Sequence, residues 1–220
     1  TLKGYLIKIL SIISSLFAKN IIVKSEEMIF HLPKILSSKI NVIPNGIDTK
    51  FFYPMPMHDA KSHIGFDHKK KYIMFFFSEG QVVKNPDMAT EVFRMVKNNY
   101  PDAVFFIATG LNYEDLVYYY NASHVLIHTS FHEGSNNSIK EALSCNLPIV
   151  SVNVGDAGER LRNVNNCFVL DSYDPIEFAS KVEELLYLDE RSNGHKFIKE
   201  ISIENTAKKV AKVYEEIHNG

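Results

Sequence analysis

From residue 71 onward, short hydrophobic runs alternate with segments that have a helical period. This alternation is typical of βαβ units, in which helices connect parallel strands. Because such crossovers are right-handed, the pattern predicts an α/β fold with a doubly wound parallel sheet. The predicted strands cover residues 72–77, 103–108, 124–128, 148–152 and 167–170. One helix is predicted to begin at Pro86, and the others cover residues 113–120, 136–144, 156–161 and 176–188.

The helix that begins at Pro86 has the clearest start. We expect Asn85 to cap it, and proline suits the first helical position because no N–H is needed there. Acidic residues at 87 and 91 suit its first two turns. The face expected to be buried consists of Ala89, Val92, Phe93 and Val96.

The first 44 residues lie outside this alternation. We expect them to form a helix at 2–17, a strand at 20–23, a helix at 26–36 and a strand at 40–43. A final helix is predicted at 203–218, with an apolar stripe formed by Ala207, Val210, Ala211, Val213 and Tyr214.

The apolar segment from Leu2 to Ala18 is expected to be a packed helix. Its longest stretch without charge, residues 9–18, is too short to cross a bilayer. A signal peptide is disfavoured because no clear small-residue cleavage site precedes Lys19.

Composition narrows the class of protein. A chain of 220 residues with 45% hydrophobic residues can bury a real core. The net charge of −2 is spread along the chain, which argues against nucleic acid as a partner. Cys145 and Cys167 both lie in apolar segments, which fits reduced thiols in a cytoplasmic protein better than a disulfide or a zinc site.

The segment from His132 to Glu159 carries the strongest chemical signal. It contains Glu133, a glycine, a polar run from Ser135 to Ser138 that can open a helix, and Glu141 within that helix. The first N–H groups of a helix have no internal acceptor and lie at the positive end of its dipole, so they can bind a diphosphate. The two glutamates would lie roughly 10–12 Å apart. This layout predicts a sugar-nucleotide site, with phosphates between two carboxylates that accept sugar hydroxyls.

The predicted fold places this segment at a suitable edge. Ligands of such sheets bind at the carboxyl ends of the strands, and the Glu133 loop follows strand 124–128. Lys84 follows the first strand and can reach a phosphate as a point charge. Each residue also has a purely structural explanation: Lys84 and Glu133 as solvated loop residues, Glu141 in a salt bridge, and Ser135 to Ser138 as a cap without a ligand.

The same segment resembles the donor-site motif of the family 4 glycosyltransferases, which are retaining enzymes of the GT-B fold. The matching residues are Glu133-Gly134, Glu141-Ala142 and Pro148-Ile149-Val150. The resemblance implies a Rossmann-like GT-B C-terminal domain. It also implies that Glu133 lies near the donor hexose and that Glu141 accepts hydrogen bonds from the ribose hydroxyls.

Other segments extend the resemblance. Residues 43–48, Ile-Pro-Asn-Gly-Ile-Asp, are similar to the junction between the acceptor and donor domains of that family, although Pro-Asn-Gly also forms ordinary turns. Lys84 matches a phosphate-binding lysine, but Glu79 stands where the family has an arginine partner. The loop at 155–159 resembles a Gly-Gly-x-Pro-Glu turn, which implies that the backbone at Gly155 approaches the donor sugar.

The resemblance implies three parts of the chain. Residues 1–44 correspond to the end of an N-terminal acceptor domain and the junction. Residues 45–202 correspond to the donor-binding domain, and residues 203–220 to a helix that crosses back to the acceptor domain.

A metal site is disfavoured. His124, His128 and His132 recur every four residues, but His124 and His128 fall in a predicted strand, where that spacing corresponds to about 13 Å. The resemblance likewise implies a metal-independent enzyme without a cofactor. The tyrosines at 118–120 are expected in the core and the cleft wall.

The function implied by the resemblance is transfer of a hexosyl group from a UDP- or GDP-sugar, with retention, to an acceptor sugar or lipid-linked glycan. Such a reaction belongs to polysaccharide or glycoconjugate biosynthesis, in the cytoplasm or peripherally at the inner face of the membrane. It is expected to need the rest of the acceptor domain. Glu133 and Lys84 are the predicted catalytic residues. The predicted donor-binding residues are Lys84, Glu133, Gly134, Ser135, Asn136, Asn137, Ser138, Glu141 and Gly155.

Two alternatives stay open. One is an inactive nucleotide-sugar-binding or interaction subunit whose residues 1–17 contact a partner chain or a membrane surface. The other is a GT-B-like sugar-nucleotide epimerase or phosphorylase.

Overall fold

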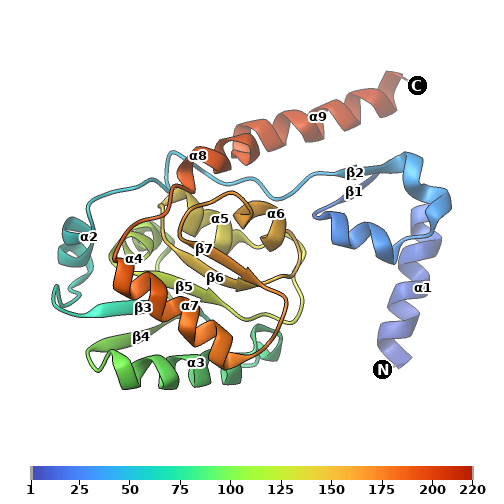
Figure 1. Cartoon of the computed structure of the whole chain (residues 1–220). Coiled ribbons are helices and arrows are strands. Elements are labelled where there is room, and N and C mark those ends of the chain that lie inside the picture. The colour runs from blue at the N-terminus through green and yellow to red at the C-terminus, as the bar shows by residue number, and fades with distance from the viewer. Residues whose placement is uncertain (1, 220) are drawn as a thin grey trace.

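A parallel sheet of five strands forms the centre of the larger part of the chain, in a computed structural model that describes residues 2–219 (Figure 1). The strand order is β4-β3-β5-β6-β7. The chain adds β4 on one side of β3 and then adds β5, β6 and β7 on the other side, as in doubly wound sheets. The predicted fold class is therefore confirmed. The strands are β3 (Lys71–Phe76), β4 (Ala103–Ala108), β5 (Val125–His128), β6 (Ile149–Val152) and β7 (Cys167–Leu170).

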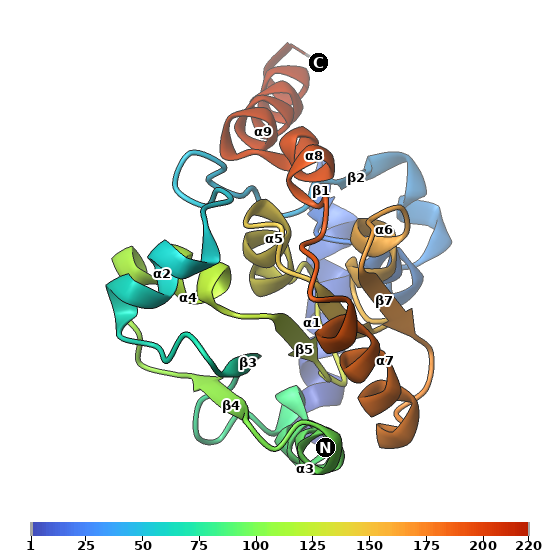
Figure 2. The ribbon, with the colours of Figure 1, turned by 60° about the vertical axis from the view of Figure 1, so that its left-hand side comes forward.

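Helices cover both faces of this sheet, and Figure 2 shows α3 and α7 on one side with α4 and α5 on the other. Side chains alternate along β3, so Ile73 and Phe75 pack with α3 and α7, whereas Met74 packs with α4 and α5. Burial on both faces explains why the strands read as continuous hydrophobic runs. The helices are α3 (Pro86–Asn99), α4 (Leu116–Ala122), α5 (Asn137–Ser144), α6 (Ala157–Leu161) and α7 (Pro175–Leu188).

The N-terminal part forms a small separate sheet. Strands β1 (Ile21–Val23) and β2 (Ile40–Val42) pair in parallel, and α1 (Leu2–Phe17) precedes them. The prediction of a single helix at 26–36 is wrong. Two short 3-10 helices occur instead, η1 (Glu26–His31) and η2 (Lys34–Lys39), because Pro33, with ψ 136°, interrupts the helical backbone.

Asn85 was also predicted incorrectly. Its side chain makes no capping hydrogen bond, and its backbone is left-handed with φ 53°. Asparagine tolerates this conformation, which turns the chain from η3 (Val82–Lys84) into α3. Segment 113–120 begins as a 3-10 turn, η4 (Tyr113–Asp115), before α4. Other short elements were not predicted: η3, α2 (Met57–Ile64), α8 (His195–Ile198) and η5 (Lys199–Ile201).

The junction segment is joined to the start of α9 (Ile203–Asn219) by backbone hydrogen bonds. The N–H of Ile47 donates to the carbonyl of Ile201 at 3.0 Å, and the N–H of Ile203 donates to that of Ile47 at 2.9 Å. Gly46 lies so close to α9 that a Cβ atom there would be 2.9 Å from Ile203 Cα. Only a glycine fits this approach.

The helix α9 then runs beside the N-terminal part (Figure 1). Val213 is buried, and Lys19 Nζ donates to the carbonyl of Ile217 at 3.4 Å. Ala207, Ala211 and Tyr214 of the predicted apolar stripe are exposed. A helix is thus present at the predicted position, and its apolar stripe is only partly covered. The division of the chain into three parts stays a prediction.

The helix α1 exposes apolar side chains around much of its surface. Within residues 2–219, no helix combines the length and apolar character that a membrane span needs. The exposed large apolar side chains of α1 are Tyr5, Leu6, Ile7, Ile9, Leu10, Ile13, Leu16 and Phe17.

We expect Gly46→Ala to lower the free energy of unfolding by about 1–3 kcal/mol, because the added methyl group would overlap backbone that cannot rotate away. Urea denaturation measures the change. Gly134→Ala is the control, since the nearest atom to its added Cβ is the flexible Met28 Sδ at 3.6 Å. Equal stability of the two variants would contradict the close approach at Gly46.

Candidate functional site

A cleft of about 420 Å³ opens at the carboxyl ends of β3 and β4, against the N-terminus of α5. This is the edge at which ligands bind in doubly wound sheets. Most of the predicted donor-site residues meet there, although they come from distant segments of the sequence. The cleft is lined by Phe76, Phe77, Ser78, Gln81, Lys84, Ala108, Glu133, Ser135, Asn136, Asn137, Ser138 and Glu141.

Glu133 and Lys84 form an ion pair inside the cleft. Lys84 Nζ lies 2.6 Å from Glu133 Oε1, and both side chains are largely buried. Burial opposes ionisation of Glu133, but hydrogen bonds to His128 and Lys84 outweigh it and lower its pKa to about 2. Glu133 is therefore a carboxylate at neutral pH. As an anion it can accept hydrogen bonds from a ligand's hydroxyl groups.

His128 anchors the floor of this loop. It is almost fully buried, and burial lowers its pKa, which favours the neutral ring. Nδ1 of His128 lies 2.9 Å from the hydroxyl of Ser151. Nε2 lies 2.6 Å from the side-chain amide nitrogen of Asn136 and 3.4 Å from Glu133 Oε1. The ring thus contacts Ser151, Asn136 and Glu133 beneath the loop.

The side chain of Asn136 opens α5. Its Oδ1 accepts from the N–H of Ile139 at 3.2 Å and from the hydroxyl of Ser138 at 2.6 Å. The cap thus satisfies one of the exposed N–H groups of the first turn. The N–H groups of Asn137 and Ser138 lie in the same turn, where a helix provides no internal acceptor. Both residues line the cleft, so their N–H groups suit an anion.

A buried ion pair holds this turn in place. Lys140 Nζ lies 3.3 Å from Asp156 Oδ2, and neither side chain has meaningful exposure. Asp156 also accepts from the hydroxyl of Ser135 at 2.9 Å and from the N–H of Asn136 at 3.1 Å. The structure therefore gives Asp156, which stands where the resembled turn has glycine, a role in fixing the start of α5.

Glu141 lies at the inner end of the cleft. The hydroxyl of Tyr120 donates to its Oε2 at 2.6 Å. Burial raises the pKa of Glu141 to about 7, although the hydrogen bond from Tyr120 and the charge of Lys140 act against it. Near neutral pH the site therefore holds two carboxyl groups of different character, with Glu133 ionised and Glu141 partly protonated.

Gly134 and Gly155 lie beside the cleft and do not line it. The N–H of Gly155 donates to Glu27 Oε2 at 2.7 Å, and a Cβ on Gly134 would face Met28 Sδ. A Cβ on Gly155 would lie 2.9 Å from the carbonyl oxygen of Glu133, so the two loops pack backbone to backbone. Their assignment as donor-binding residues stays a prediction.

The neighbourhood of Lys84 differs from the expectation. Glu79 is exposed and does not line the cleft, so it does not face a ligand beside Lys84. Ser78 and Gln81 line the cleft and were not identified from the sequence. Their only signal was their place in the loop after β3.

The three histidines at 124, 128 and 132 have separate surroundings. Nδ1 of His124 accepts from the N–H of Tyr72 at 2.9 Å, and burial lowers its pKa to about 3. His128 bonds Ser151 and Asn136, while His132 is exposed. Within residues 2–219 no cluster of three or more histidine, cysteine or acidic residues has the arrangement of a metal site.

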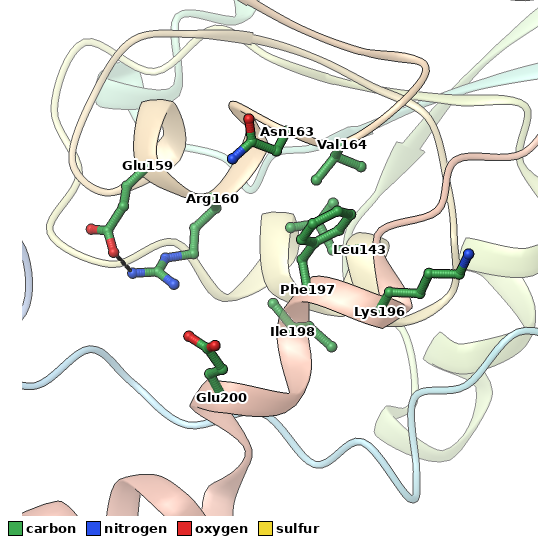
Figure 3. A pocket seen from close by; sticks show the side chains of 9 residues that line it. All are labelled: Leu143, Glu159, Arg160, Asn163, Val164, Lys196, Phe197, Ile198 and Glu200. Atoms are coloured by element: carbon green, nitrogen blue, oxygen red, sulfur yellow. Dashed lines mark hydrogen bonds and ion pairs between the residues drawn. The ribbon is translucent and has the colours of Figure 1, made fainter.

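A second pocket, of about 240 Å³, lies between α6 and α8. Figure 3 shows Arg160 directed at Glu159, with which it forms an ion pair, while Lys196 extends away from both. The charges of Glu159 and Arg160 in this pocket are therefore already paired with each other.

Comparison with known proteins gives one family. The family model for group 1 glycosyl transferases matches residues 73–187, slightly more than half of the chain. That range contains all of the residues that line the cleft. No curated protein sequence matches the chain.

Solved structures show the same fold at low sequence identity. Sucrose-phosphate synthase from Thermosynechococcus elongatus is 17% identical with a TM-score of 0.75, over 94% of this chain and 61% of that one. Anabaena Alr3699/HepE in complex with UDP is 15% identical with a TM-score of 0.73, over 92% of this chain and 65% of that one. The C-terminal domain of LpcC, a group 1 family glycosyl transferase from Francisella tularensis, is 14% identical with a TM-score of 0.56, over 75% and 98%. The chain thus spans less than two thirds of the first two structures.

The ion pair of Glu133 predicts a pH dependence of stability. Because its pKa falls from 4.5 to about 2 on folding, the carboxylate stabilises the folded chain fully above about pH 4.5 and progressively less toward pH 2. Glu133→Gln should therefore cost about 1–2 kcal/mol of stability at pH 7 and less at pH 3. Urea denaturation at both pH values measures this difference.

The control for this prediction is Glu184→Gln, which removes an exposed carboxylate whose ion pair with Lys181 is well solvated. Its stability should stay close to that of the wild type at both pH values. A loss in Glu133→Gln that is equal at pH 3 and pH 7 would show that ionisation of Glu133 does not stabilise the fold.

Proposed function

We propose that this chain, which belongs to the group 1 glycosyltransferases, binds a UDP- or GDP-linked sugar and takes part in hexosyl transfer to an acceptor sugar or lipid-linked glycan. The observation that carries the proposal is the cleft at α5. It joins a lysine, two carboxyl groups and the first turn of a helix within one space of about 420 Å³.

Each part of the cleft suits one part of a sugar nucleotide. The N–H groups of Asn137 and Ser138 and the ammonium group of Lys84 suit the diphosphate. Glu141 suits the ribose hydroxyls, and Glu133 suits the hydroxyls of the hexose. Phe76 and Phe77 line the same cleft and offer aromatic surface beside the polar groups. The match between parts of the ligand and parts of the cleft supports a nucleotide sugar over a simple phosphate.

The proposed transfer proceeds with retention of configuration. The bond between the anomeric carbon and the diphosphate oxygen breaks, and the acceptor oxygen bonds to the same face of that carbon. The departing diphosphate takes the acceptor's proton. Lys84 and the N–H groups of α5 would stabilise the charge that develops on the diphosphate, which is the kind of preorganised stabilisation that lowers barriers most.

We further propose that transfer requires an acceptor-binding part in addition to this chain. The solved structures with TM-scores of 0.75 and 0.73 are longer than the chain, which covers 61% and 65% of them. The cleft described above contains groups for a donor. We therefore expect donor binding by the chain alone and transfer only in the company of an acceptor-binding part.

A second candidate is a nucleotide-sugar-binding subunit without transferase activity. It is favoured by the state of Lys84, whose charge is already paired with Glu133, and by Glu79 at the position where the resembled family has an arginine. The two candidates share the binding step and differ only in turnover.

Isothermal titration calorimetry with UDP-glucose and GDP-mannose tests the shared step. We expect one of them to bind the wild-type chain and Glu141→Ala to weaken that binding at least about tenfold, since hydrogen bonds to a charged group contribute about 1.5–3 kcal/mol. Glu184→Ala, which removes an exposed carboxyl group on α7, is the matched control and should bind normally. Absence of binding by both sugars, or unchanged binding in Glu141→Ala, would overturn the proposal.

A further inference from the structure

Tyr120 is a fully buried side chain whose only polar atom reaches the cleft through Glu141. Its hydroxyl lies 2.6 Å from Glu141 Oε2. The ring packs edge-on against Phe52 at 5.8 Å and lies 5.5 Å from Phe76, a residue of the cleft wall. Aromatic neighbours thus fix the ring, and the ring directs its O–H at the carboxyl group.

The neighbouring tyrosines show that this contact is specific to one residue of the run at 118–120. Tyr118 stacks on His63 and Tyr119 stacks on Phe106, each with its ring on another aromatic side chain. Neither has a hydrogen bond to Glu141 among the contacts of residues 2–219. A need for bulk alone would not explain a hydroxyl placed at hydrogen-bonding distance from a cleft carboxyl group.

We propose that Tyr120 is a positioning residue that holds Glu141 in the orientation and the ionised state in which it accepts the ribose hydroxyls of the donor. The proposal rests on the function proposed above. Because Tyr120 donates to Oε2, the carboxyl group cannot rotate freely, and Oε1 stays available for the ligand. An ionised carboxylate can accept hydrogen bonds from two hydroxyl groups. In a protonated carboxyl group one of the two oxygens carries an O–H and acts as a donor.

The electrostatic surroundings make the hydroxyl of Tyr120 important near neutral pH. Burial raises the pKa of Glu141 to about 7. The hydrogen bond from Tyr120 and the charge of Lys140 prevent a larger rise of this pKa. Tyr113 and Cys145 also face Glu141, and burial raises the pKa of both, so they are neutral at this pH. Lys140 is therefore the one cation among these neighbours, and it is shared with Asp156.

The test measures affinity for the nucleotide sugar that binds the wild-type chain, UDP-glucose or GDP-mannose, between pH 5.5 and 9. The phosphates of these sugars each keep a single charge over this range, so they do not contribute to the pH dependence. For the wild type, affinity should rise with pH around a midpoint near 7. Tyr120→Phe keeps the ring and removes the hydroxyl. The midpoint of this variant should shift upward by about one pH unit. The ionised carboxylate of Glu141 loses a hydrogen bond, and a hydrogen bond to a charged group corresponds to about one pKa unit or more.

With that shift, the ionised fraction of Glu141 at pH 7 falls about fivefold, so Tyr120→Phe should bind about fivefold more weakly at pH 7 and nearly as well as the wild type at pH 9. Tyr119→Phe, which removes the neighbouring hydroxyl, is the matched control and should keep the wild-type profile. A variant that merely loosened the core would bind more weakly at every pH.

A double-mutant cycle separates positioning from packing. In a Glu141→Gln background the affinity should no longer depend on pH near 7, and adding Tyr120→Phe should change it by less than about twofold. An unshifted midpoint in Tyr120→Phe, or an equal loss of affinity at pH 7 and pH 9, would overturn the role of Tyr120 while leaving the proposed function intact. Failure of the wild type to bind either sugar would overturn both.

Discussion

The ion pair of Lys140 and Asp156 is the interaction on which the cleft depends. Both side chains are buried, with Nζ and Oδ2 3.3 Å apart. Burying two charges costs free energy that their attraction only partly returns, so such a pair is weak evidence of stability. Its effect here is geometric. Asp156 accepts from Ser135 and from the N–H of Asn136, so the pair fixes the turn that opens α5. Removing one partner would leave a buried charge beneath that turn.

Three further contacts build on this anchor from the N-terminal side. Asn45 donates its N–H to Ser135 Oγ at 3.2 Å and its side-chain amide to Asn137 Oδ1 at 3.3 Å. Glu27 accepts from the N–H of Gly155 at 2.7 Å. The loop at 133–136 thus contacts the starts of α5 and α6, and it also contacts the N-terminal segment. This arrangement ties the geometry of the cleft to the position of residues 24–28 and 45.

Much of the sheet could be predicted because its strands are buried on both faces. Such strands appear as hydrophobic runs bounded by polar turns, and the ranges expected for β4 and β7 match the structure residue for residue. The grouping of Lys84, Glu133 and Glu141 also followed from topology, since the carboxyl ends of parallel strands meet at one edge.

What could not be predicted depends on contacts between distant residues. Nothing local distinguishes Tyr120 from Tyr119 as the partner of Glu141, because the choice is made by how α4 packs on α5. Asp156 stands where the resembled turn has glycine, and its role depends on Lys140, which lies beneath it and is distant in the sequence. The break at Pro33 is different, since proline is a local signal that outweighs the apolar period around it.

The ion pair of Lys84 and Glu133 connects the two proposed roles of these residues. Lys84 Nζ lies 2.6 Å from Glu133 Oε1, so its charge is already paired. A bound diphosphate would compete for that ammonium group with two negative charges and would also gain the N–H groups of Asn137 and Ser138, which have no competing carboxylate in the first turn of α5. If Lys84 moved toward the diphosphate, Glu133 would lose its strongest partner. Its oxygens would then become available to the hexose hydroxyls, so in the proposed function a single lysine would couple binding of the phosphates to orientation of the sugar.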